Sequence, residues 1–129
     1  MKKFGIINAR LIGELTDLKH MDTLVICDAG FPVPQNGNII DLSLVNGIPT
    51  AIQVLEAVTK EIGFEEFAVF DDLETVNKEY FDIFEKLLPL QRRILYSPQE
   101  FVAESKNAKL FIRTGDFAPY SNILLTSAC

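Results

Sequence analysis

Apolar residues recur at intervals of three or four along four segments of the chain, which predicts four amphipathic helices. Residues that favour a helix start or stop flank these segments. Ser97 and Pro98 suit the first positions of a helix, and Gly63 and Pro89 each follow an apolar stripe that they would end. The predicted helices cover residues 8–18, 49–62, 77–88 and 97–106.

Uninterrupted runs of apolar and β-branched residues lie between these segments and predict strands. The run TLVICDA shows no alternation of polar and apolar positions, which is typical of a central strand covered on both faces. A loop rich in Gly, Pro and Asn follows it at residues 30–38. The predicted strands are residues 23–29, 66–70, 92–96, 109–115 and 120–126, with a short extended piece at 39–44.

This order of elements predicts an α/β fold. We expect a single domain over residues 1–129, with three layers, α/β/α, built around a mixed, largely parallel sheet. The short turn GDFAP joins the last two predicted strands, and a parallel crossover needs a longer connection. We therefore expect these two strands to pair antiparallel with each other.

The composition describes an ordinary globular protein and excludes several classes of function. The net charge of −6 argues against nucleic acid, whose phosphates select clustered Lys and Arg. No apolar stretch reaches the roughly 20 residues that span a bilayer, so we expect no membrane partner and a cytoplasmic location. A mean hydropathy of +0.18 favours either apolar surface covered by other subunits or a tightly packed monomer.

His20 and Asp28 lie at the two ends of the first predicted strand, in HMDTLVICDAGFPVP. Open α/β sheets bind ligands beyond the carboxyl ends of their strands, where Asp28 and Arg113 are expected. Asp28 either binds a small polar ligand or caps the following loop. Arg113 either joins that site or forms an ion pair with Asp28 or Asp41. His20, the only histidine, either caps the end of the first helix or transfers protons.

Other chemical motifs are missing or are better explained by structure. The sequence contains no glycine-rich phosphate loop, no GxSxG motif and no His/Cys cluster of metal-binding type. Cys27 lies inside an apolar strand, where a small core residue is expected rather than a nucleophile. The run DDLE at 71–74 lacks a nearby histidine, which favours the solvated start of a helix over a metal site.

Three stretches together resemble the D-ribose pyranase family, whose relatives are the L-fucose mutarotases. They are HMDTLVICDAGFPVP at 20–34, IIDLSL at 39–44 and IRTGDFAPYSNILL at 112–125. The opening MKKFGIINARLIGELTDLKH is also similar to the start of that family. The resemblance is collinear from residue 1 to about 125 and is strongest in the first and third stretches.

The resemblance implies an isomerase that interconverts the pyranose and furanose rings, or the anomers, of a free monosaccharide such as D-ribose, without metal or organic cofactor. It also implies a cytoplasmic homodecamer of two stacked pentameric rings, with sites at the subunit boundaries. By their places in the motifs, His20 would be the catalytic acid/base and Asp28 a sugar-binding carboxylate. Tyr120, Ser121 and Asn122 match the family's Tyr-small-Asn segment, which also contacts sugar.

The chain departs from the family pattern at two places. Pro98 occupies the position where ribose pyranases commonly carry a histidine that contacts sugar, and the chain ends in TSAC instead of an apolar tail. Proline has no donor, so that contact is either lost or made by another residue, such as Gln99 or Arg93. Two alternatives therefore stay open: a mutarotase for a 6-deoxyhexose such as L-fucose, and a non-catalytic sugar-binding ring protein.

Overall fold

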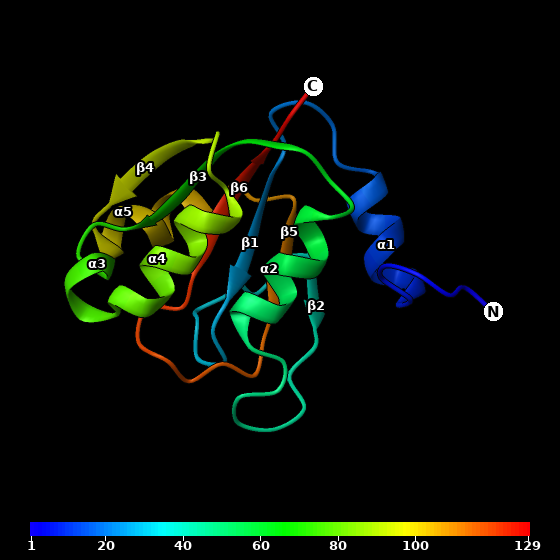
Figure 1. Ribbon diagram of the computed structural model, residues 1–129, viewed down its shortest axis with the longest axis horizontal. Coiled ribbons are helices and arrows are strands. Elements are labelled where there is room, and N and C mark those ends of the chain that lie inside the picture. The colour runs from blue at the N-terminus through cyan, green and yellow to red at the C-terminus, as the bar shows by residue number, and fades with distance from the viewer.

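Six strands form one sheet in the order β2-β5-β1-β6-β3-β4 (Figure 1). The computed structural model describes residues 1–129. The strands are β1 (Thr23–Cys27), β2 (Ile39–Asp41), β3 (Phe64–Phe70), β4 (Arg92–Tyr96), β5 (Leu110–Arg113) and β6 (Ile123–Ser127). The helices are α1 (Ala9–Thr16), α2 (Ala51–Thr59), α3 (Leu73–Val76), α4 (Lys78–Leu87) and α5 (Pro98–Ser105).

The predicted three-layer α/β/α domain with a mixed, largely parallel sheet is confirmed. Figure 1 places α2 and α4 in front of the sheet, α5 behind it and α1 beside the β2 edge. The pairs β1–β5, β2–β5 and β3–β4 are parallel, and only β6 runs against its two neighbours, β1 and β3. None of the helices has the length and apolar character of a membrane-spanning segment.

The prediction that the last two strands pair with each other is wrong, because β1 lies between them. Both β5 and β6 start or end short of the predicted turn, so nine residues, 114–122, connect them. Crossing one intervening strand takes about 10 Å, which nine residues span easily. The insertion gives β1 a hydrogen-bonded neighbour on each side, and its residues Leu24 to Cys27 are fully buried.

Side-chain caps set the starts of the helices close to the predicted positions. Thr50 caps α2 in a capping box with Gln53, one residue after the predicted start at Pro49. Ser97 caps α5 in the same way, with Pro98 at the first helical position as predicted. The acidic run 71–74 leads into the short helix α3, which was not predicted separately.

Cys27 is a core residue, as predicted. Its side chain is fully buried, and this burial raises the pKa of the thiol to about 12. The thiol is therefore neutral at physiological pH and is not a nucleophile.

Gly115 allows the loop after β5 to pack against the turn before α2, and we expect substitution to disrupt this contact. A Cβ atom at Gly115 would lie 2.4 Å from the Ile48 carbonyl oxygen and 2.5 Å from that of Val45. Because both atoms belong to backbone, Gly115→Ala should lower the free energy of unfolding by roughly 1–3 kcal/mol. Urea unfolding at fixed protein concentration measures the change.

Gly13→Ala is the matched control. Gly13 lies inside α1, and a Cβ atom there would meet nothing within 4 Å. We expect this variant to gain about 0.5–1 kcal/mol, because alanine is the better helix former. Equal stability of the two variants would contradict the packing role of Gly115.

Candidate functional site

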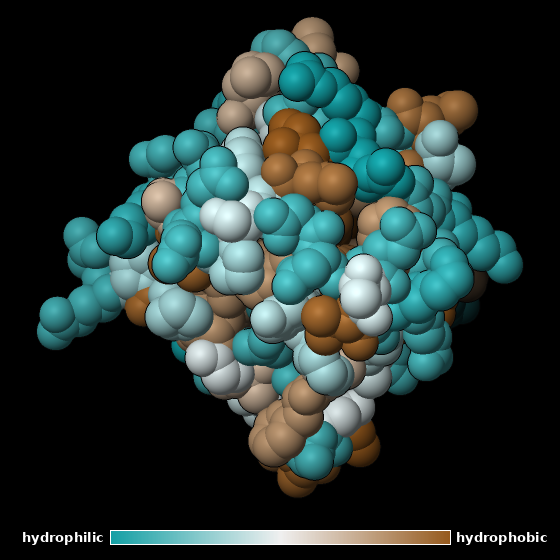
Figure 2. Space-filling view, turned by 90° about the vertical axis from the view of Figure 1, so that its left-hand side faces the viewer, coloured by the Kyte–Doolittle hydropathy of each residue, from teal (hydrophilic) through white to brown (hydrophobic).

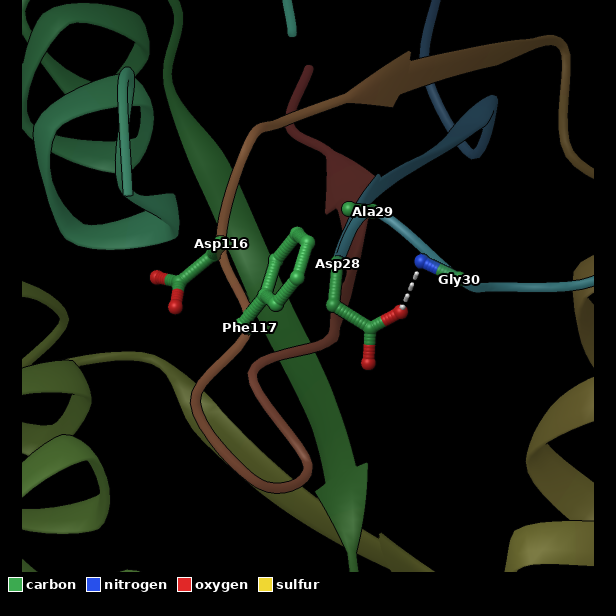
Figure 3. Close-up of a pocket in the computed structure, with 5 residues that line it drawn as sticks. All are labelled: Asp28, Ala29, Gly30, Asp116 and Phe117. Carbon is green, nitrogen blue, oxygen red and sulfur yellow. Dashed lines mark hydrogen bonds between the residues drawn. The ribbon is translucent and has the colours of Figure 1, made fainter. Parts of the chain in front are cut away.

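Five strands run in one direction and β6 runs against them. The carboxyl ends of the five strands therefore lie at the same end of the sheet as the start of β6, and this end is called the carboxyl edge below. A cavity of about 370 Å³ opens at this edge beside the end of β1 (Figure 3). Its lining residues are Asp28, Ala29, Gly30, Asp116 and Phe117. The strand ends thus place polar groups from two loops around one space.

Asp28 and Asn122 form the polar centre of this edge. The Asp28 N–H donates to Asn122 Oδ1 at 2.8 Å, and Asn122 Nδ2 donates to Asp28 Oδ2 at 3.1 Å. The other carboxylate oxygen of Asp28 accepts the Gly30 N–H at 3.0 Å. Asp28 therefore caps its loop, as one interpretation of the sequence held, and it also lines the cavity. Its carboxylate remains half-buried and accessible from the cavity.

Tyr120 and Ser121 lead the chain from the cavity into β6. Tyr120 has a φ of 57°, in the left-handed region, and its ring lies 4.8 Å from that of Phe70 between centroids. Ser121 is fully buried, and its hydroxyl donates to the Ala118 carbonyl at 2.9 Å. The structure thus brings Asp28, Tyr120 and Asn122 to one edge, while the Ser121 hydroxyl is used within its own loop.

Asp116 is a buried carboxylate that fastens the same loop to two helices. Asp116 Oδ2 accepts the Ala51 N–H, the first of α2, at 2.9 Å and the Tyr80 hydroxyl of α4 at 2.6 Å. Its Oδ1 accepts the Ala118 N–H at 2.8 Å. In Figure 3 this carboxylate points away from Asp28. Asp116 therefore shapes the cavity wall, and its charge is satisfied by donors inside the protein.

Phe117 completes the wall with an aromatic ring that is 67% exposed. A carboxylate that can accept hydrogen bonds beside an accessible ring is an arrangement that suits a small ligand with hydroxyl groups and an apolar face. No group of three or more His, Cys, Asp or Glu side chains is arranged to hold a metal ion.

Arg113 has the structural role that was one of its two interpretations. Its Nε lies 3.8 Å from Asp41 Oδ2, and its Nη1 donates to the carbonyls of Ala29 and Phe31. Hydrogen bonds from Ser43, with the nearby Arg113 charge, lower the pKa of Asp41. Arg113 therefore holds the loop that follows Asp28, and its partner is Asp41 rather than Asp28.

His20 lies at the opposite end of the strands from the cavity, three residues before the first residue of β1. Between it and Asp28 stands the whole of β1, which covers about 13 Å at ~3.3 Å per residue. The imidazole makes no hydrogen bond with the end of α1; Asp17 is the C-cap there. The nearest acidic group is Glu65, with His20 Nδ1 4.0 Å from Glu65 Oε1. The helix-capping interpretation of His20 is therefore wrong.

Asp116 and Phe117 line the cavity, although the sequence pattern predicts them only as part of the turn GDFAP. One signal could have found them: Asp116 lies three residues after the end of β5, Asp28 lies directly after the end of β1, and these two strands are parallel neighbours. The wrong pairing of the last two strands concealed that relation.

The chain is similar to known proteins over its whole length. The RbsD / FucU transport protein family matches residues 1–129. A D-ribose pyranase of Lactobacillus gasseri is 38% identical over 127 residues, which are 98% of this chain and 97% of that protein. The structure of Bacillus subtilis RbsD complexed with D-ribose is 38% identical and has a TM-score of 0.95, covering 100% and 98% of the two chains.

A more distant structure shares the fold. The fucose mutarotase of Streptococcus pneumoniae, in complex with L-fucose, is 18% identical, with a TM-score of 0.80 over 95% of this chain and 94% of that one. At this identity the likeness concerns the fold alone.

Tyr80→Phe tests how strongly Asp116 depends on its donors. The change removes the hydroxyl that lies 2.6 Å from the buried carboxylate. We expect the free energy of unfolding at pH 7 to fall by about 1–3 kcal/mol, because a buried acceptor loses a partner. Tyr96→Phe is the control, since the Tyr96 hydroxyl makes no hydrogen bond. Urea unfolding measures the loss of stability in each variant. Equal effects would contradict this role of the hydroxyl.

The same variant has a predicted pH dependence. Burial, and then the hydrogen bond to Asp116, raise the pKa of Tyr80 above its ordinary value of 10.0. Above pH 10 the unfolded chain therefore loses this proton before the folded protein does, and the wild type loses stability as the pH rises. Phenylalanine cannot titrate, so the difference between wild type and Tyr80→Phe should narrow between pH 9 and about pH 11.

Proposed function

This chain belongs to the RbsD / FucU transport protein family, and on that premise we propose that it is an intramolecular isomerase that interconverts the pyranose and furanose forms of D-ribose. One observation carries the proposal. The hydrogen-bonded pair Asp28–Asn122 lies at a cavity in a chain that is 38% identical, end to end, to a protein whose structure contains D-ribose.

The chemistry requires one proton acceptor and one proton donor. In ring opening the anomeric hydroxyl loses its proton, the bond between the anomeric carbon and the ring oxygen breaks, and the ring oxygen gains a proton. Closure through a different hydroxyl gives the other ring size, and closure on the other face gives the other anomer. A histidine can accept and return the proton, so the reaction is redox-neutral and balanced without metal or organic cofactor.

We assign the proton transfer to His20 and the binding of sugar hydroxyls to Asp28, Tyr120 and Asn122. The Asp28 carboxylate accepts hydrogen bonds, the Asn122 amide donates and accepts them, and the Tyr120 ring offers an apolar face. Ser121 belongs to the same segment; its hydroxyl is already bonded to Ala118, so we expect it to support the segment's conformation.

This assignment requires a second copy of the chain. His20 and Asp28 lie at opposite ends of β1, and one chain cannot bring both to one small sugar. We therefore propose that His20 of one subunit completes the cavity of its neighbour, in a decamer of two pentameric rings. Large exposed apolar side chains support such contacts; among them are Phe4, Ile7, Leu44, Val45, Leu90 and Phe117. Figure 2 shows apolar patches between polar surface on one side of the molecule.

We further propose that the protein acts in the cytoplasm on a small-molecule sugar. The net charge of −6 does not suit nucleic acid. Cys27 and Cys129 are both free thiols, which fits a reducing cytoplasm.

His20→Ala should slow the catalysed exchange between ribose ring forms by about 10²–10⁴-fold, because the acid/base group is lost. The fold should survive, since the side chain is 51% exposed. Magnetization-transfer NMR of D-ribose at equilibrium measures the exchange, with circular dichroism as the control for folding and L-fucose as the comparison sugar. Unchanged exchange in the variant would contradict the role of His20.

The wild-type result separates the alternatives. Faster exchange of L-fucose alone would indicate a mutarotase and would make Pro98 a determinant of sugar preference. Saturable ribose binding without faster exchange would indicate a non-catalytic sugar binder.

Mixing two inactive variants tests whether the site is shared. We expect His20→Ala and Asp28→Asn to be inactive alone, and an equal mixture, unfolded and reassembled together, to recover about a quarter of wild-type activity. In an equal mixture half of the subunits keep Asp28 and the other half keep His20. A complete site needs one of each side by side, which random assembly provides at about a quarter of the sites. No recovery, or a scattering mass equal to the 14.5 kDa of one chain, would contradict a site between subunits.

A further inference from the structure

The loop that carries His20 is fastened to the end of β6. The Met21 N–H donates to the Ser127 carbonyl at 3.2 Å, and the Ser127 N–H donates to the Asp22 carbonyl at 2.8 Å. Met21 has a φ of 72°, a left-handed conformation that persists in residues other than glycine only where the surroundings hold it. The backbone beside His20 is therefore fixed, although the imidazole itself is half exposed.

A β-bulge on β3 places Glu65 against this loop. Between Phe64 and Glu66 the strand advances two residues while β6 advances one, so Glu65 has no partner on β6. Bulges of this kind re-aim side chains and are over-represented next to active sites. Here Glu65 Oε1 lies 4.0 Å from His20 Nδ1.

The other charged groups around the loop already have partners. Asp22 accepts the Lys19 N–H at 2.7 Å and Lys109 Nζ at 3.1 Å, and Asp17 pairs with the same Lys109. Glu65 is the only acidic side chain with an oxygen within 4.0 Å of an imidazole nitrogen. Its side chain is 41% exposed, so it is free to cross the remaining gap of about 1 Å to hydrogen-bonding distance.

We propose that Glu65 is a positioning residue for His20: its carboxylate accepts the Nδ1–H of the imidazole and leaves Nε2 as the atom that exchanges protons with the sugar. A carboxylate on one ring nitrogen fixes the tautomer and the orientation of the ring. The negative charge also stabilises the imidazolium that exists between the two proton transfers. This role rests on the proposed function, because it takes His20 as the acid/base.

The tautomer can be measured directly, because the chain has one histidine. Magic-angle-spinning NMR of the assembled protein labelled with ¹⁵N in the imidazole distinguishes Nδ1–H from Nε2–H at any particle size. In spectra of the neutral imidazole, we expect the Nδ1–H tautomer in the wild type. Glu65→Ala should shift it to Nε2–H and lower kcat for ribose exchange at least about tenfold, with a smaller change in KM.

Glu66→Ala is the matched control, since it removes the same charge one residue along β3, where the side chain faces Arg92 and Thr126. We expect its tautomer and kcat to equal those of the wild type. An unchanged tautomer in Glu65→Ala, or a changed tautomer with unchanged kcat, would overturn the positioning role while leaving the proposed function intact. A wild type that does not accelerate exchange would instead overturn the proposed function, and the role of Glu65 with it.

Discussion

The arrangement of the cavity depends on one constraint, the insertion of β6 between β1 and β3 in the opposite direction. Because β6 runs against its neighbours, its first residues lie where the parallel strands end. Asn122, directly before β6, therefore meets Asp28, directly after β1, and the two exchange backbone and side-chain hydrogen bonds. A parallel strand at this place would begin at the opposite edge of the sheet, beside His20.

The same insertion creates a connecting loop that a buried carboxylate, Asp116, ties to the helices. The connection from β5 to β6 must cross the end of β1, so its backbone leaves the sheet and needs partners elsewhere. The Asp116 carboxylate supplies one of them, since it accepts the Ala118 N–H of its own loop. The same carboxylate also accepts hydrogen bonds from Ala51 of α2 and Tyr80 of α4, which ties the loop to both helices. The helices of one layer thus hold the loop that shapes the cavity, and core packing and site geometry are coupled through one carboxylate.

Local patterns predicted the elements better than their connections. Ser97 and Pro98 identified the start of α5, and the run at 92–96 matches β4 residue for residue, because caps and apolar periodicity depend on neighbours in sequence. The partner of β5 could not be predicted in this way. Strand order depends on which strands hydrogen-bond to the two sides of β1, and no short stretch of sequence carries that information. The bulge at Glu65 was missed for the same reason, since an extra residue exists only relative to the partner strand.

The distance between His20 and Asp28 follows from the rigidity of β1. This strand is hydrogen-bonded on both sides and its last four residues are fully buried, so it cannot shorten or bend to bring its two ends together. At one end Asp28 is held by Asn122, and at the other the His20 loop is held by Ser127, both at the ends of β6. β1 and β6 therefore keep His20 and Asp28 a fixed distance apart. Under the proposed function, in which His20 of one subunit completes the cavity of its neighbour, that fixed distance leaves the contact between subunits to decide how closely the imidazole approaches the cavity.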